Sequence, residues 1–103
     1  MIAMQVAEII AEYAVFLELT GDEELDPDTA VKMMEALAGH LQEMDKGFLR
    51  ELVDAFPVIA ERYSGEAQEV VRSISHGYYL EEALAVDDPV KLAALEVLRD
   101  ARG

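Results

Sequence analysis

Residues 26–44 read DPDTAVKMMEALAGHLQEM, and this stretch decides the fold class. It begins with the strongest helix-start signal of the sequence, because Asp26 can cap a helix and Pro27 suits its first position. Behind this start, apolar residues recur at alternating spacings of four and three, the period of a helix with one buried face. These residues are Ala30, Met34, Leu37, Leu41 and Met44. The stretch therefore predicts an α-helix that packs along one face.

A third helix is expected to begin after Asp45, which can cap it. Its apolar residues keep the helical period as far as Tyr63, and they do so on both sides of Pro57. Proline lacks the N–H that a helix interior uses and disfavours helical angles in the preceding residue. We therefore expect one helix with a kink at Pro57 in preference to two separate helices.

The last third of the chain carries two more helix starts. Ser64 can cap a fourth helix, which Gly77 interrupts, and the residues after Gly77 either continue this helix or form a short separate one. Asp88–Pro89 repeats the cap-then-proline signal at the start of a final helix. No stretch shows the alternation of apolar and polar residues that marks a strand. The sequence predicts an all-α fold, a compact antiparallel bundle of four main helices plus a C-terminal helix, in a single helical domain over residues 1–103.

The first helical segment, residues 2–19, is apolar around most of its circumference. Its polar residues Gln5, Glu8 and Glu12 lie on one narrow stripe, and Gly21 supplies the stop signal behind it. We expect this helix to lie at the centre of the bundle or to form half of a homodimer seam. The residues that would face the second copy are Ile2, Val6, Ile9 and Tyr13.

The composition restricts the classes of partner. The chain has 22 acidic and 8 basic residues, and its net charge is −14. This charge repels nucleic acids and anionic membrane surfaces, so neither is expected as a partner. A basic protein would be attracted, although acidity can also serve solubility alone. The apolar N-terminal segment lacks a basic start and is interrupted by acids, so we expect no signal peptide or membrane span and a cytoplasmic location.

The sequence offers no set of residues for catalysis, and we expect the protein not to be an enzyme. There is no cysteine, and neither His40 nor His76 follows a glutamate at the spacing that helical metal sites use. The acidic residues 22–28 lack the register of a calcium loop. We therefore predict no catalytic residue, no metal ion and no cofactor.

Carboxylates without nearby bases form two clusters that are candidate contacts for a partner protein. Residues 1–31 contain eight acids and no base, and a second base-free stretch covers residues 73–90. Aromatic side chains beside uncompensated charges are typical of protein-binding surfaces. Of the adjacent Tyr78 and Tyr79, we expect one to be buried and one exposed. The predicted contact residues are Asp22, Glu23, Glu24, Asp26, Asp28, Tyr79, Glu81 and Glu82.

Residues 16–53 carry a pattern that resembles a known class of proteins. It comprises Phe-Leu-Glu-Leu from Phe16, Asp26-Pro27-Asp28-x-Ala30-Val31, Met34-Glu35-x-Leu37, Leu41-Gln42 and Phe48-Leu49-Arg50-x-Leu52. This pattern resembles the small acidic helical immunity proteins of bacteria, which bind and inhibit a cognate toxin. The resemblance implies an immunity or antitoxin-like protein whose partner is a toxin enzyme, and the acidic surface suits a toxin that is basic. The alternative is a homodimeric helical scaffold or adaptor without an inhibitory role.

Overall fold

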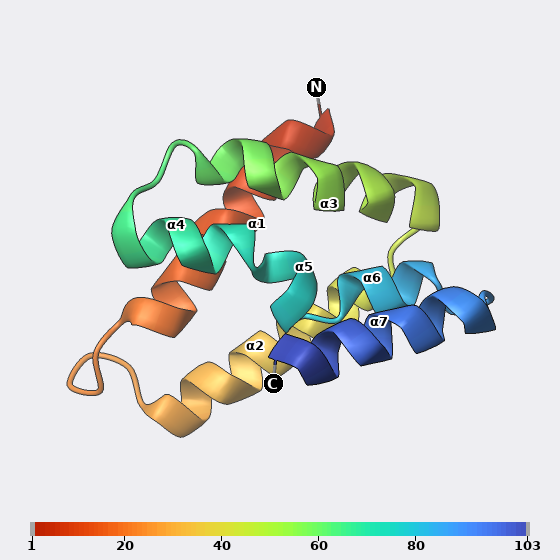
Figure 1. Ribbon diagram of the computed structural model, residues 1–103. Helices are drawn as coiled ribbons and strands as arrows, with labels where there is room; N and C mark the ends of the chain where they lie inside the picture. Colours follow the sequence, from red (N-terminus) through yellow and green to blue (C-terminus); the bar gives the residue numbers. More distant parts are fainter. Residues whose placement is uncertain (1, 103) are drawn as a thin grey trace.

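The computed structural model describes residues 2–102, with the backbone alone at Arg102, so Met1 and Gly103 of the predicted domain lie outside the described residues. Within this range the chain forms helices and no strand (Figure 1), which confirms the all-α class. The helices are α1 (Ile2–Leu19), α2 (Pro27–Gln42), α3 (Lys46–Ala60), α4 (Gly65–Arg72), α5 (Ile74–Gly77), α6 (Leu80–Leu84) and α7 (Pro89–Arg102). None of the helices between residues 2 and 102 is long and apolar enough to cross a membrane.

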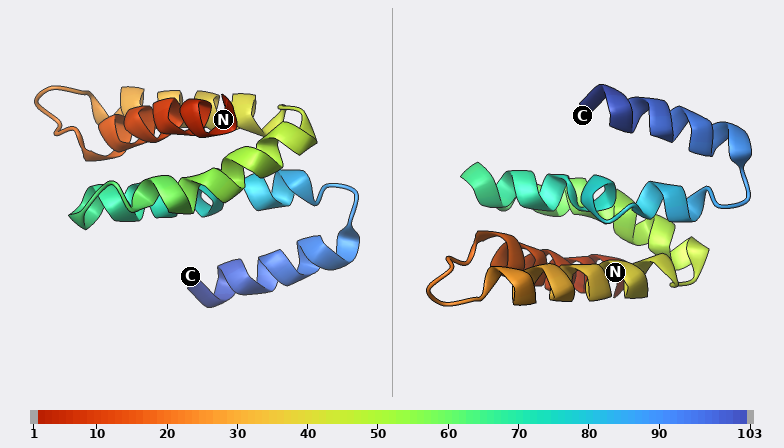
Figure 2. Two further views of the ribbon diagram at one scale, coloured as in Figure 1. Left: turned by 90° about the horizontal axis from the view of Figure 1, so that it is seen from above. Right: turned by 90° about the horizontal axis from the view of Figure 1, so that it is seen from below.

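The helices lie in three layers (Figure 2). Helices α1 and α2 form one outer layer, α3 to α6 form the middle layer, and α7 lies alone on the far side. The radius of gyration is 13.9 Å, slightly above the roughly 13 Å expected of a compact domain of this length. The excess agrees with the peripheral position of α7, whose main contacts are with α6.

Helix α3, and not α1, lies at the centre of the core. The largest fully buried side chains are Phe56, Leu41, Leu49, Leu52, Ile59, Leu80 and Val71, and α3 supplies four of these seven. It contacts α1, α4, α5 and α6. The expectation that the first helix is central is therefore wrong, because the most enclosed helix is the one in the middle layer.

Helix α1 buries mainly alanines, together with Ile10. Alanines at one face are almost completely buried and allow α1 to approach α3 and α4 closely; they are Ala3, Ala7, Ala11 and Ala14. The larger residues Ile2, Ile9, Tyr13 and Phe16 are exposed instead. The apolar circumference that the sequence shows thus divides into a buried face, made of four alanines and Ile10, and a face on which several large side chains are exposed.

The chain begins a helix at all four predicted positions, and at three of them the predicted side chain forms a capping hydrogen bond. Asp26 accepts a hydrogen bond from the Thr29 N–H at 3.0 Å, and Asp45 accepts one from the Phe48 N–H at 3.0 Å. The carboxylate of Asp88 likewise accepts from a backbone N–H of α7, at 3.1 Å. Ser64 precedes α4, but its side chain forms no capping hydrogen bond, so that part of the prediction is wrong.

Helix α3 continues through Pro57 as one element, as we expect from the sequence. Of the two alternatives for the residues after Gly77, the structure shows the short separate helix, α6, and the predicted fourth helix is further divided into α4 and α5. Ser73 ends α4, and Tyr79 adopts left-handed angles (φ 58°, ψ 36°) between α5 and α6. The chain therefore does not show four long helices, and the finer prediction of an antiparallel four-helix bundle is not confirmed.

Candidate partner-binding surface

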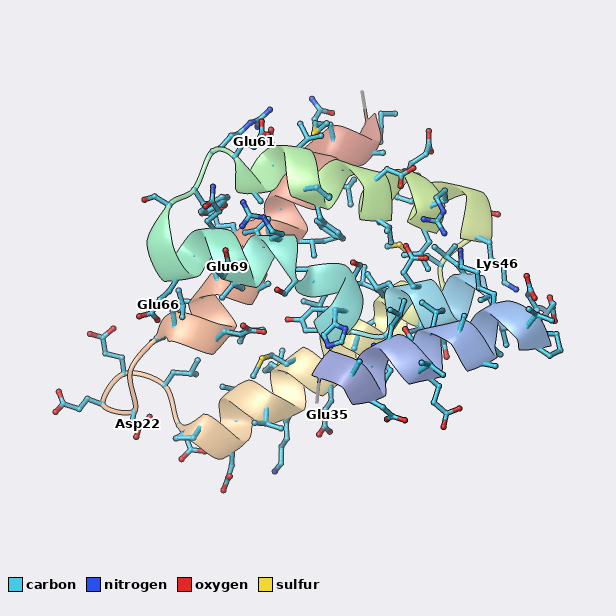
Figure 3. The ribbon with its side chains drawn as sticks, in the orientation of Figure 1. Asp22, Glu35, Lys46, Glu61, Glu66 and Glu69 are labelled. Atoms are coloured by element: carbon cyan, nitrogen blue, oxygen red, sulfur yellow. The ribbon has the colours of Figure 1, made fainter. Side chains whose placement is uncertain are left out.

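Four of the five predicted acids of residues 22–28 lie on the loop that joins α1 to α2, Asp28 lies in the first turn of α2, and all five are exposed. Figure 3 shows Asp22 on this loop, which projects from the body of the molecule. Within residues 2–102, none of the five carboxylates forms an ion pair. The loop therefore presents negative charge that no base of the described chain neutralises.

Asp26 differs from the other loop acids because the fold already uses its carboxylate. One oxygen accepts hydrogen bonds from both the backbone N–H and the hydroxyl of Thr29, at 3.0 and 3.2 Å. This carboxylate fixes the start of α2, where a negative charge is also favoured by the helix dipole. Asp22, Glu23, Glu24 and Asp28 are free of such contacts and remain available to a partner.

An apolar groove begins beside this loop and runs between α1 and α2. Its volume is about 510 Å³, and every lining residue belongs to α1, α2 or the loop between them. Helix α1 contributes Ile9, Ile10, Tyr13, Phe16 and Leu17, the loop contributes Leu25, and α2 contributes Met33, Ala36, Leu37 and His40. Tyr13 is 61% exposed, so large apolar side chains face outward here. A contiguous exposed apolar surface of this kind is typical of interaction sites.

The second predicted cluster is not a free acidic surface. Glu81 accepts two hydrogen bonds from Arg50 on α3, at 3.0 and 3.1 Å. Glu82 accepts from Arg99 on α7, at 2.8 and 3.1 Å. The prediction that these two carboxylates are uncompensated is wrong, because helices far away in sequence bring a base to each of them.

Glu8 is a third acid whose charge is compensated. It pairs with Arg62, which lies just beyond the end of α3, so the N-terminal third is not a surface of one sign throughout. Residues 22–28 carry five acids without an ion pair, and further unpaired acids lie elsewhere in the described chain, such as Glu51, Glu61 and Glu66. A base-free stretch of sequence thus predicts unpaired charge only where the fold brings no distant base to it.

The structure does not bring the two predicted clusters together. The α1–α2 loop lies at one end of the molecule, whereas α6, which carries Glu81 and Glu82, lies toward the other end (Figures 1 and 2). Tyr79 is about half exposed, and Tyr78 is only 5% exposed, which confirms that one tyrosine is buried and one is not. The predicted contact residues therefore form two separate surfaces, and only the loop adjoins the apolar groove.

The histidines lie in different surroundings. His40 is exposed at the groove, and His76 is half-buried near Arg99, whose Nη2 donates to the His76 carbonyl at 2.8 Å. Between residues 2 and 102, no three histidine, aspartate or glutamate side chains are placed to hold a metal ion. His40 adds the only ring nitrogens to an otherwise apolar set of groove residues.

Sequence reasoning identified the loop but missed the groove. The signal was present, since residues 2–19 are too apolar for a helix with one buried face. The alanines at spacings of four and three in that segment mark the face that packs closely, which leaves the large side chains to the outside.

Searches found no match to a protein-family model, to a curated protein or to a solved structure.

Proposed function

We propose that the protein is a binding module that captures a basic partner protein in the groove between α1 and α2. The observation that carries this proposal is the juxtaposition of an exposed apolar groove with four unpaired carboxylates, three on the adjoining loop and Asp28 in the first turn of α2. Apolar area supplies affinity, and charge at the rim raises the association rate and selects the sign of the partner. Neither function requires catalytic residues.

The shape and lining of the groove suit an amphipathic helix of the partner. Two parallel rows of apolar side chains, from α1 and α2, can receive the apolar face of a third helix. Leu25 stands where the acidic loop meets the groove. A partner helix with Lys or Arg at the end that reaches the loop would place its charges beside Asp22, Glu23 and Glu24.

The partner class that we favour is a basic toxin enzyme, which the protein would inhibit as an immunity or antitoxin-like protein. The resemblance that supports it covers residues 16–53, a range that includes the loop, α2 and the C-terminal part of α1. The acidic loop falls within this range, whereas the groove lies in it only in part, because Ile9, Ile10 and Tyr13 precede it. Binding that covers a basic active-site cleft would be sufficient for inhibition.

A homodimeric scaffold is the second candidate function. It is favoured by the exposed side chains on α1, since Ile2, Ile9 and Tyr13 all face outward as a seam requires. Pairing of two copies along this face would, however, place the acidic loops of both copies in one dimer. The two negatively charged loops would repel each other, and we therefore prefer a basic partner.

Affinity purification from the organism that encodes the chain tests the proposal. The tagged protein should retain one basic protein at low salt, and the enzymatic activity of that protein should be suppressed in the complex. Two variants test the two parts of the site. The groove variant, Phe16→Ser/Met33→Ser, should no longer retain the basic protein. The loop variant, Asp22→Asn/Glu23→Gln/Glu24→Gln, should retain less of it at moderate salt.

A matched control separates the loop from charge in general. The variant Glu51→Gln/Glu61→Gln/Glu66→Gln removes the same number of charges from exposed acids on α3 and α4 and should bind as the wild type does. Equal retention by the loop and control variants would refute the loop assignment. Recovery of only the tagged protein as a defined dimer would instead favour the scaffold.

A further inference from the structure

Helix α7 carries an apolar stripe that the rest of the chain leaves uncovered. None of its described residues belongs to the buried core, and its main contacts are with α6. The half-buried residues Leu92, Leu95 and Arg99 lie on the side that faces α6. The opposite side repeats exposed apolar residues at helical spacing. These residues form the α7 stripe and are Val90, Ala93, Ala94, Val97 and Ala101, with Leu98 at the edge.

The α7 stripe and the α1–α2 groove are complementary in shape but lie on opposite sides of the molecule. The groove is hollow, whereas the stripe is the convex side of a single helix. Figure 2 shows α1 and α2 in one outer layer and α7 on the far side, with α3 to α6 between them. While α7 stays on α6, a chain therefore cannot cover its own groove with its own stripe. A second copy can.

The charges of α7 also suit the groove. No other helix between residues 2 and 102 has more basic than acidic residues. Helix α7 has three basic and two acidic residues, namely Lys91, Arg99 and Arg102 against Glu96 and Asp100. Lys91 borders the stripe, is exposed and forms no ion pair within the described residues. An unpaired base thus accompanies the stripe, and unpaired acids adjoin the groove.

A stripe seated in a groove is the arrangement of two copies that covers both apolar surfaces. Helix α7 has 14 residues and is about 21 Å long, close to the length of about 24 Å for the 16 residues of α2. Two stripes packed on each other would leave both grooves uncovered. Two grooves packed on each other would bring the acidic loops of both copies together.

We propose that α7 of one copy docks in the α1–α2 groove of a second copy. The contact rests on the same groove as the proposed function, so a basic partner protein competes with α7 for it. The two contacting surfaces differ and lie on opposite sides of the molecule, so two copies cannot close both contacts at once. Assembly therefore continues head to tail beyond a dimer and covers the groove when no partner is present.

Sedimentation equilibrium at about 150 mM salt, over about 10 µM to 1 mM protein, tests this assembly. The mean mass of the wild type should rise with concentration and pass that of a dimer. The stripe variant, Val90→Ser/Val97→Ser, and the groove variant, Phe16→Ser/Met33→Ser, should each associate at least about tenfold more weakly. The control Val31→Ser/Val58→Ser changes two exposed valines outside both surfaces and should associate as the wild type does.

A mixture of the two deficient variants tests which surfaces meet. The groove variant keeps its stripe, and the stripe variant keeps its groove, so an equimolar mixture should form a 1:1 dimer and nothing larger. Three results would each overturn the proposal: a wild type that stays monomeric at about 1 mM, a mixture without a dimer, or either variant associating alone as strongly as the wild type.

Binding of a basic amphipathic Leu/Lys peptide separates this inference from the proposed function. The stripe variant should bind the peptide at least as tightly as the wild type, because its groove is intact and free of α7. A wild type that stays monomeric but binds the peptide in the groove would refute the α7 contact alone. A wild type that assembles through α7 but binds neither the peptide nor a basic protein would refute the proposed function alone.

Discussion

The guanidinium of Arg99 lies over the ring of Tyr79, with its carbon 3.8 Å from the ring centroid. The same group donates to Glu82 at 2.8 Å, and both charged side chains are only 24% exposed. Tyr79 is in turn the residue with left-handed backbone angles between α5 and α6. A single arginine of the last helix thus contacts the one non-glycine residue of the described chain that has a positive φ.

Replacement of this arginine should loosen α7. Arg99→Ala removes a cation–π contact and charge-assisted hydrogen bonds and leaves Glu82 without its base, so we expect a loss of roughly 2 kcal/mol in unfolding free energy. Hydrogen exchange of the α7 amides should accelerate more than that of α3. The Arg99→Lys variant keeps the charge but not the planar guanidinium group, so its unfolding free energy should lie between those of the wild type and Arg99→Ala. Unchanged protection of α7 in Arg99→Ala would contradict this role.

Two substitutions at Tyr79 should reveal the cost of its backbone conformation. Tyr79→Gly and Tyr79→Ala lose the same ring contacts, but glycine adopts φ 58° without a Cβ penalty. We expect the glycine variant to be more stable than the alanine variant by about 1 kcal/mol, measured by urea denaturation. An alanine variant that is equally or more stable would show that this position is not strained.

The alanine face of α1 should tolerate no larger residue. Ala11 is completely buried where α1 packs on the middle layer, so Ala11→Leu should lower the unfolding free energy by about 1–3 kcal/mol. Ile9→Ala, on the exposed face of the same helix, should change it by about 0.5 kcal/mol or less. A larger loss of unfolding free energy in Ile9→Ala than in Ala11→Leu would show that the large side chains of α1, and not its alanines, pack on the middle layer.

The raised pKa of Glu18 makes a pH-dependent prediction. The folded state holds the Glu18 proton more tightly than the unfolded chain, whose value is 4.5, so this residue lowers stability as pH rises from 4.5 through its folded pKa. Glu18→Gln should therefore raise the melting temperature at neutral pH. The gain should disappear below pH 4.5, where both states bind the proton. A gain that is the same at both pH values would exclude ionisation of Glu18 as its cause.

Local signals predicted the helix boundaries well. Asp26 and Asp45 cap their helices as their positions before a helical period indicate, because capping depends on residues only three positions apart. Pro57 does not end α3, since its ring lies on the exposed side of that helix, as the sequence period suggests. The expected burial of one tyrosine of the 78–79 pair also follows from local geometry.

Features that depend on distant contacts were not predictable in the same way. The sequence predicts no base beside Glu81 and Glu82. In the fold, however, Arg50 pairs with Glu81 and Arg99 pairs with Glu82, each from another helix. The final helix shows the same limit, because Val90, in a regular apolar row, is 81% exposed. Periodicity identifies an apolar face, but only the packing of the layers determines whether that face is covered.

Affinity for a basic amphipathic peptide, measured as a function of salt concentration, tests the central claim most directly. The probe is a Leu/Lys peptide of about 18 residues with one apolar face, and its control has the same composition in a scrambled order. The wild type should bind the probe more tightly than the control. Phe16→Ser/Met33→Ser should abolish that preference, and Asp22→Asn/Glu23→Gln/Glu24→Gln should flatten the salt dependence. Equal binding of probe and scrambled peptide, with no effect of either variant, would contradict a binding site between α1 and α2.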